Sequence, residues 1–264
     1  MAFPQSRSIV ALVRAVSPRL QECVLTHLGR TSIDSAVASA QHHRYCRTLA
    51  DLGARVEFVE PLPAAPDGVF VEDTAIVVGE AAVVCRPGVD SRLAETTSVA
   101  RALAPYRRLI HLTEAARLEG GDVLQAGRKL YVGRSGRTND AGIAELGAAL
   151  EPLGYQVRPL DLDGCLHLKT ACTFIPPDLV LANPAWVDVS AFQDVEVETV
   201  AAAEPYAANT LTLGGVTLVA AGAVGTARKL AARGVATREV DLSELARAEG
   251  ALTCTSVLFA QNGS

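Results

Sequence analysis

The chain has 264 residues and a mass of 27.6 kDa, enough for one large domain or two small ones. Its formal net charge is −5 and its Lys and Arg residues form no run, which argues against nucleic acid or an anionic membrane as a partner. Apolar residues make up 49% of the chain, but their runs are too short to span a membrane, so a globular protein is expected.

The first part of the chain offers one short apolar stretch, IVALV, between Arg7 and Arg14. This stretch is too short for the core of a signal peptide and has no small-residue cleavage pattern, which favours a cytoplasmic protein. The six cysteines include no CxxC pair, so free thiols are expected in that compartment.

Short apolar strands and helices are expected to alternate along the chain. In chain order, the sequence predicts a strand at 9–15, a helix at 31–53, a strand at 55–60, a hairpin at 74–85, a helix at 91–106, a hairpin at 123–133, a helix at 138–154, a strand at 155–162, hairpins at 170–183 and 210–221, a helix at 243–250 and a strand at 255–260. Three of the four hairpin links contain glycine. The helix at 138–154 has Thr138 or Asn139 as its N-cap and ends at Gly154.

A polar residue stands at the start of each of five apolar strands. The starts Asp73, Asp122, Thr170, Asn209 and Cys254 are spaced by 49, 48, 39 and 45 residues. This period predicts a five-bladed α/β propeller of hairpin–helix–strand units, with the strand at 9–15 closing the ring. A doubly wound α/β sheet is the alternative. The ring is favoured because it brings the polar starts together at one axis, namely Glu72, Asp73, Asp122, His167, Asn209 and Cys254.

Cys254 and His167 are the candidate nucleophile and its partner. A thiol reacts only as the thiolate, so Cys254 needs either a lowered pKa or a positively charged substrate. A cysteine and a histidine far apart in sequence form a common nucleophilic pair. The alternatives are a cysteine that packs as a small apolar residue and a buried histidine with its hydrogen bonds satisfied.

The segment PDGVFVEDTAIV at 66–77 carries three carboxylates, Asp67, Glu72 and Asp73. Glu72 and Asp73 lie within an apolar stretch that reads as a strand, and buried acids are costly unless they are paired. Neighbouring strand residues face opposite sides, so one acid is expected to face the site and the other to support it. Read alone, Asp67 would be an ordinary turn residue.

Two arginines supply the opposite charge. Arg92 and Arg137 can bind a carboxylate bidentately, although either one in isolation reads as a surface arginine. The pair Gly120-Gly121 allows a close approach of the backbone, and Asp122 is expected to orient His167. These groups together fit a free amino acid that carries a guanidino group. The acids would bind its cationic head, the arginines would bind its anionic tail, and a thiol and a histidine would stand beside it.

At these residues the chain resembles the dimethylarginine dimethylaminohydrolases of the guanidino-group-modifying superfamily. The matching motifs run in family order from about residue 66 to the end and are PDGVFVEDTAIV, CRPGVDSR, LEGGDVL, YVGRSGRTN, LHLKTACT, ANTLTL and GALTCTSVL. IVALVRAV near the start also fits. The resemblance implies a pentein-like five-bladed α/β propeller, in which residues 1–264 form a single catalytic domain.

The resemblance also implies the reaction and the residues that perform it. It implies hydrolysis of dimethylarginine or monomethylarginine to citrulline and the corresponding amine, with Cys254 as nucleophile, His167 as general acid and base, and no cofactor or metal. It implies substrate contacts from Leu25, Asp67, Glu72, Asp73, Arg92, Arg137 and the backbone of Ala248. A homodimer is compatible with the sequence.

Two positions separate this chain from relatives of the resembled family. Glu249 stands where the family commonly has Asp, which could change how the guanidinium nitrogens are held. The related arginine deiminases typically carry His-x-Asp, whereas this chain has His167-Leu168-Lys169. Loss of that acid should make room for N-methyl groups. The stretch between Arg14 and Thr31, where a lid is expected, is short.

Three other functions compete with this prediction. An arginine deiminase-like enzyme or another guanidino hydrolase, acting on arginine or agmatine, is the nearest, and agmatine would not need Arg92 and Arg137. A non-catalytic propeller would be expected to lack the thiol, histidine and acids that this chain has. A zinc site built from Cys165, His167 and Cys172 has an unusual spacing, although zinc could still inhibit by capturing the Cys254 thiolate.

Overall fold

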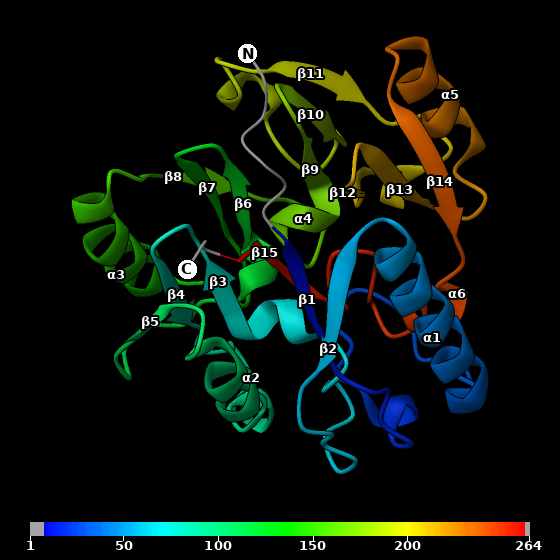
Figure 1. Cartoon of the computed structure of the whole chain (residues 1–264). Coiled ribbons are helices and arrows are strands. Elements are labelled where there is room, and N and C mark those ends of the chain that lie inside the picture. The colour runs from blue at the N-terminus through cyan, green and yellow to red at the C-terminus, as the bar shows by residue number, and fades with distance from the viewer. Residues whose placement is uncertain (1–7, 262–264) are drawn as a thin grey trace.

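The computed structural model describes residues 8–261 and contains five three-stranded sheets arranged around one axis (Figure 1). Each sheet consists of an antiparallel pair joined to a third strand by parallel pairing. The predicted five-bladed α/β propeller is therefore confirmed, and the doubly wound sheet is wrong.

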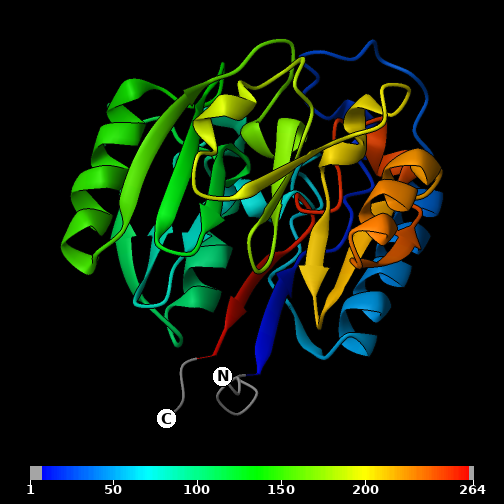
Figure 2. The ribbon, with the colours of Figure 1, turned by 90° about the horizontal axis from the view of Figure 1, so that it is seen from above.

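The sheets follow one another in chain order. Their strand orders are β15-β1-β2 (Val257–Ala260, Ile9–Val13, Ala54–Phe58), β3-β4-β5 (Ala75–Val77, Ala81–Val84, Arg108–His111), β6-β7-β8 (Val123–Ala126, Lys129–Arg134, Gln156–Asp161), β9-β10-β11 (Cys172–Ile175, Leu179–Ala182, Glu196–Thr199) and β12-β13-β14 (Leu211–Leu213, Val216–Ala220, Ala236–Val240). As expected, the first sheet closes the ring, because β1 pairs with β15 from the far end of the chain (Figure 2).

Helices cross over between the second and third strands of four sheets. They lie at the outer edge of the ring (Figure 1) and are α1 (Ser35–Asp51), α2 (Glu95–Leu103), α3 (Asp140–Leu150) and α5 (Val224–Ala232). Asp34 caps α1 by accepting from two backbone N–H groups, and Asn139, one of the two predicted caps, caps α3. In the described residues the crossover from β10 to β11 contains only a 3₁₀ turn, Val189–Ala191, so the hairpin–helix–strand unit is incomplete there.

The hydrophobic core is divided among clusters that lie between neighbouring sheets. Strand β1 shows how one strand serves two of them. Val10 and Leu12 pack with Val99 of α2, whereas Ala11 and Val13 pack with Leu49 of α1. Because alternate side chains of a strand point to opposite faces, a strand buried on both faces reads as a continuous apolar run. No helix within residues 8–261 is long and apolar enough to cross a membrane.

Arg14, directly after β1, joins the first sheet to the second. The side chain is fully buried and donates to the carbonyl oxygens of Glu60 (3.1 Å), Gly68 (2.5 Å) and Glu95 (2.9 Å) and to Oγ of Ser98 (2.7 Å). Burial lowers the pKa of this guanidinium to about 10. Replacing the side chain would leave four buried acceptors without their donor.

We expect Arg14→Met to lower the free energy of unfolding by about 2–4 kcal/mol, measured by chemical denaturation. The control is Arg101→Met, because the Arg101 side chain is 72% exposed and pairs with Glu60 at the surface. That change should stay within about 0.5 kcal/mol. Equal effects of the two substitutions would contradict a structural role for Arg14.

Candidate active site

The predicted site residues lie on turns just ahead of the innermost strands. Glu72 and Asp73 belong to the 3₁₀ helix Val71–Thr74, and His167 is the N-cap of the one-turn helix α4, Leu168–Ala171. Cys254 precedes β15 by three residues. The expectation that Glu72, Asp73 and Cys254 lie within strands is therefore wrong. In a 3₁₀ turn successive side chains are about 120° apart, so neighbouring acids can reach different cavities.

One small cavity of roughly 20 Å³ at the axis, here called the axial cavity, collects most of the predicted site. Its lining consists of Val24, Asp67, Phe70, Asp73, Arg92, Arg137, Leu166, His167, Ala248, Glu249 and Cys254. Residues from four separate regions of the chain, 24, 67–92, 137–167 and 248–254, thus meet at one place. The thiol of Cys254 and the imidazole of His167 face the same enclosed space.

Glu72 and Leu25 lie outside that lining. Glu72 faces a second cavity of about 300 Å³ that is lined by the innermost strands, here called the channel. Its two oxygens accept from Nζ of Lys169 at 2.5 Å and from Oγ1 of Thr253 at 2.7 Å. Burial raises the pKa of Glu72, and Lys169 and Thr253 oppose that rise. Leu25 packs against a hydrophobic cluster that includes Phe70.

His167 lies between two buried carboxylates. Its Nε2 lies 2.6 Å from Oε2 of Glu119, and its Nδ1 lies 3.9 Å from Oδ1 of Asp73. Burial by itself would lower the pKa of the imidazole, but Asp73, Asp122 and Glu119 outweigh burial and raise it to about 9. The ring is therefore an imidazolium at neutral pH, which makes it a proton donor.

Glu119 is the partner of His167 that the sequence analysis missed. It is fully buried, accepts from N–H of Gly88 at 2.9 Å, and lies 3.6 Å from Nη1 of Arg137. The expectation that Asp122 orients the ring directly is wrong. Asp122 accepts from the backbone N–H of Leu168 (3.0 Å) and from the hydroxyls of Ser135 (2.6 Å) and Thr138 (2.7 Å). In the sequence, the signal that could have identified Glu119 was its position directly before the glycine pair in LEGGD.

The predicted close approach at Gly120-Gly121 is confirmed. A Cβ on Gly121 would lie 2.7 Å from Oδ1 of Asp73 and 2.7 Å from Nδ1 of His167. A Cβ on Gly120 would lie 2.0 Å from the carbonyl oxygen of Glu72. Only glycine therefore lets this backbone separate Asp73 from the imidazole without displacing either.

Arg92 balances much of the buried negative charge. Its Nη1 donates to Asp73 at 2.8 Å, and its Nη2 donates to Glu95 at 2.9 Å and to the carbonyl of Phe70 at 3.1 Å. Burial would raise the pKa of Asp73, but His167 and Arg92 lower it below its usual value. Asp73 is therefore an anion at neutral pH, and Arg92 is already engaged by the protein itself.

Arg137 and Asp67 contact the segment that covers the cavity. Nη2 of Arg137 donates to Oγ1 of Thr26 at 2.9 Å. Both oxygens of Asp67 accept from N–H of Val24 at 3.2 Å. Burial raises the pKa of Asp67, and Arg92 and the Val24 N–H oppose that rise. The groups predicted to bind substrate thus hold protein groups of residues 24–26 in this structure.

The groups around Cys254 that favour its thiolate, the Ala251 backbone and Lys169, have smaller effects on the thiol pKa than burial has. Removal from water raises the pKa of its thiol well above the ordinary value, and the charges of Glu72 and Asp73 raise it further. The loop that carries Cys254 is fixed on the other side, because the buried Tyr45 hydroxyl donates to the carbonyl of Leu252 at 2.9 Å. The site therefore holds a protonated thiol until a cation arrives.

A metal ion has one candidate location among residues 8–261. Ligand atoms of Asp73, Glu119 and His167 lie within 4.8 Å of one another. The guanidinium of Arg92 already supplies a positive charge there, 2.8 Å from Asp73 and 3.9 Å from Glu119. The zinc set considered from the sequence, Cys165, His167 and Cys172, is not supported, because both thiols pack in an apolar cluster with residues such as Leu124 whereas His167 contacts Glu119. All six cysteines are free.

Comparison with known proteins gives consistent relatives, although no family model matches the chain. The N(G),N(G)-dimethylarginine dimethylaminohydrolase of Streptomyces coelicolor is 40% identical over 253 residues, which cover 94% of this chain and 95% of that protein. The enzyme of the same name from Pseudomonas aeruginosa is 31% identical over 236 residues, covering 89% and 92%.

The solved structures agree. A cysteine-to-serine mutant of the Pseudomonas aeruginosa enzyme, complexed with citrulline, superposes with a TM-score of 0.89 at 30% identity and covers 94% of this chain and 98% of that one. An arginine dihydrolase domain from cyanobacteria shares the fold at 20% identity, with a TM-score of 0.84. The extent and the identity of the first two matches decide the family, and this chain belongs to the dimethylarginine dimethylaminohydrolases.

Proposed function

We propose that this protein hydrolyses N-methylated arginine to citrulline and dimethylamine or methylamine, as one catalytic domain over residues 1–264. The observation that carries the proposal is the axial cavity, where the Cys254 thiol meets a buried imidazolium and a surplus of carboxylates. A cluster of anions suits a guanidinium, and a thiol suits attack on its central carbon. The names of the relatives, and the citrulline bound to one of them, support the same reaction.

Binding of the substrate prepares the nucleophile. The guanidinium enters as a cation beside Asp73 and supplies the positive charge that the Cys254 thiol lacks. The thiol then releases its proton to solvent, because a neighbouring cation stabilises the thiolate. Asp67 is proposed to join Asp73 in binding the guanidinium, and Arg137 is proposed to bind the substrate carboxylate. Arg92 acts by holding Asp73 ionised and in position.

In the first chemical step the thiolate attacks the central guanidinium carbon and forms a C–S bond, giving a neutral tetrahedral adduct. The His167 imidazolium donates its proton to the methylated nitrogen. The C–N bond then breaks, the amine departs, and a cationic thiouronium remains attached to Cys254. Glu119, 2.6 Å from Nε2, stabilises the imidazolium before transfer and holds the ring in place afterwards.

In the second step the now neutral imidazole takes a proton from water. The resulting hydroxide adds to the thiouronium carbon, and the C–S bond breaks. The remaining hydroxyl proton passes to the departing sulfur, which restores the thiol, the imidazolium and a neutral ureido product. This sequence consumes one water and yields citrulline without any cofactor or metal ion.

The preference for methylated over free arginine is proposed to depend on Lys169. This residue occupies the place of the acid expected in an arginine deiminase and pairs with Glu72. An acid facing an unsubstituted nitrogen would be satisfied only by N–H groups, so its absence removes a penalty for N-methyl groups. The arginine deiminase-like activity remains the second candidate.

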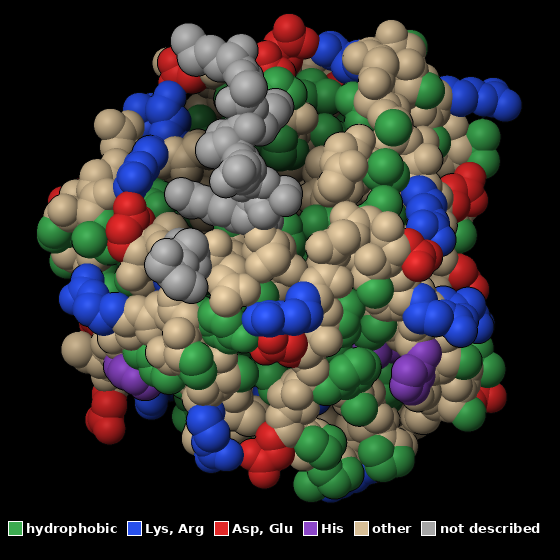
Figure 3. Space-filling model, viewed as in Figure 1, with side chains coloured by type: hydrophobic (Ala, Val, Ile, Leu, Met, Phe, Trp, Pro, Cys, Tyr) green, Lys and Arg blue, Asp and Glu red, His purple; other side chains and the backbone are tan. Residues whose placement is uncertain are grey.

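We further propose a cytoplasmic enzyme that acts on a small molecule and binds neither nucleic acid nor a membrane. Lys and Arg side chains are interspersed with Asp and Glu over the face shown in Figure 3, with no field of a single sign. A homodimer is compatible with this surface.

The function is tested by a citrulline assay with dimethylarginine, arginine and agmatine side by side. Methylated arginine should be turned over with a kcat/KM at least about 100-fold above those of the other two, the discrimination that unpaired polar groups can supply. Cys254→Ser should fold normally, as judged by its thermal unfolding, and form no citrulline. Citrulline production by this variant, or a preference for arginine, would refute the assignment.

The raised pKa of the Cys254 thiol predicts a pH profile for the free protein. Alkylation of Cys254 by iodoacetamide should rise about tenfold per pH unit from pH 6 to pH 8.5, because the rate follows the thiolate fraction. Mass spectrometry of the modified peptide, with Cys254→Ser as the control for the other five cysteines, measures this rate. A plateau below pH 8 would mean that the thiolate forms without substrate.

Lys169→Met should change the pH dependence of turnover. Loss of the ammonium raises the pKa of the buried Glu72 further, so the fraction of ionised Glu72 at neutral pH falls. We expect kcat/KM to drop about tenfold at pH 7 and to recover as pH rises, whereas Lys169→Arg keeps the charge and most activity. Lys129→Met, at a surface pair with Asp194, is the control. A loss that is the same at every pH would contradict this role.

A further inference from the structure

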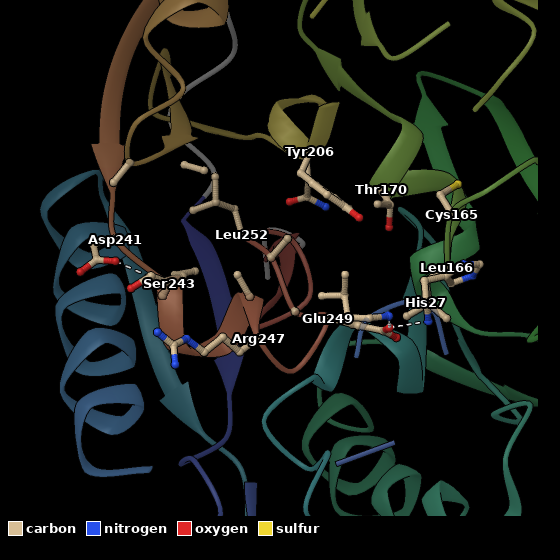
Figure 4. Close-up of a pocket in the computed structure, with 18 of the residues that line it drawn as sticks. His27, Cys165, Leu166, Thr170, Tyr206, Asp241, Ser243, Arg247, Glu249 and Leu252 are labelled. Atoms are coloured by element: carbon tan, nitrogen blue, oxygen red, sulfur yellow. Dashed lines mark hydrogen bonds between the residues drawn. The ribbon is translucent and has the colours of Figure 1, made fainter. Parts of the chain in front are cut away.

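The segment of residues 24–30, here called the lid segment, covers the axial cavity. Val24 lines that cavity, while His27, Leu28 and Gly29 line a neighbouring groove of about 550 Å³ (Figure 4). At roughly 20 Å³ the axial cavity is too small for a free amino acid the size of arginine. A substrate of that size can therefore bind only after part of the lining moves, and the lid segment, which contributes Val24, is the candidate for that movement.

The base of the lid segment is fixed by its own hydrogen bonds. The amide of Gln21 donates to the carbonyl of Thr31 at 3.2 Å and accepts from N–H of Ile33 at 2.6 Å. Nη2 of Arg30 donates to the carbonyl of Cys23 at 2.6 Å. These contacts join the two ends of the segment to each other and leave its tip to be held from elsewhere.

Glu249 holds the tip. Its Oε1 accepts from the backbone N–H groups of Thr26 (3.0 Å), His27 (2.6 Å) and Leu28 (2.6 Å), and its Oε2 accepts from Thr26 at 3.0 Å. Figure 4 shows the Glu249 carboxylate directed at His27 across the edge of the groove. Three consecutive N–H donors on one carboxylate form a charge-assisted contact that is stronger than neutral hydrogen bonds.

The backbone of Glu249 is shaped for this contact. Its φ is +59°, a left-handed conformation that is uncommon for a residue with a side chain. The next residue, Gly250, packs so tightly that a Cβ there would lie 2.1 Å from Cε1 of Phe70. Helix α6, Ser243–Ala246, ends three residues before Glu249. The left-handed backbone at Glu249 turns the chain there, so that the carboxylate points at the lid segment.

We propose that Glu249 is a positioning residue that closes the lid segment over Cys254 and gates the passage between the groove and the axial cavity. Glu249 and Leu166 are the residues that line both spaces. The role in turnover rests on the proposed function, whereas the gate itself does not depend on the identity of the substrate.

The test is Glu249→Gln, which has the same shape but presents an NH₂ group and one oxygen to three N–H donors. If Cys254 reacts only while the lid segment is open, its alkylation by iodoacetamide at pH 8 should be about tenfold faster than in the wild type. Amide hydrogen exchange of peptides covering residues 24–30 should accelerate in parallel. KM for methylated arginine should rise more than kcat falls.

Two variants control for charge and for stability. Glu249→Asp keeps the charge on a shorter side chain, so it should also speed exchange of the lid segment, although less. Glu244→Gln alters a carboxylate of α6 that also accepts a backbone N–H, from Asp34 at 2.8 Å, and it should leave both rates unchanged.

Unchanged alkylation and unchanged exchange in Glu249→Gln would overturn the gate, as would faster alkylation with unchanged exchange, since that pattern indicates a charge effect on the thiol. Faster alkylation and exchange in a protein that turns over no methylated arginine would support the gate and reject the proposed substrate.

Discussion

The structure depends on the balance of charge buried at the axis. Asp73, Glu95 and Glu119 surround Arg92, and the two acids nearest the ring also hold His167 as an imidazolium. Buried charges are tolerated only when each is paired and hydrogen-bonded, so no member can be removed without stranding another. The carboxylates still outnumber the cations. That surplus attracts a guanidinium, and it adds to burial, the larger effect, in keeping the Cys254 thiol protonated while the site is empty.

The propeller explains how residues far apart in sequence form this network. Each sheet begins at the axis with a tight turn, and the polar side chains occupy these turns. Asp73, Gly121, His167 and Cys254 come from four such positions. The chemistry collects where these turns meet, at the lining of the axial cavity.

Much of this arrangement could be predicted from the sequence, and the failures have a physical cause. The spacing of polar starts gave the ring, and Cys254 and His167 were identified by residue type. Glu119 was missed because a hydrogen bond between segments 48 residues apart leaves no local pattern. The strand expected at Glu72 and Asp73 was wrong because residues 71–74 form a 3₁₀ turn, and the rule of alternating faces holds only for extended backbone. The role of Lys169 likewise depends on its hydrogen bond to Glu72, which the sequence does not reveal.

The site is closed in different ways toward the channel and toward the groove, and this difference indicates which side the substrate uses. Toward the channel, Glu72, Lys169 and Thr253 are joined by hydrogen bonds, and Asn209 ties Lys169 to Thr253. Toward the groove, closure rests on a short backbone segment that the Glu249 carboxylate holds at three N–H groups, with further contacts from Arg137 to Thr26 and from Asp67 to Val24. A network of side chains from four turns opens far less readily than a loop held at its tip. Substrate access and product release should therefore use the groove, while the buried floor keeps the charges of the site fixed throughout the reaction.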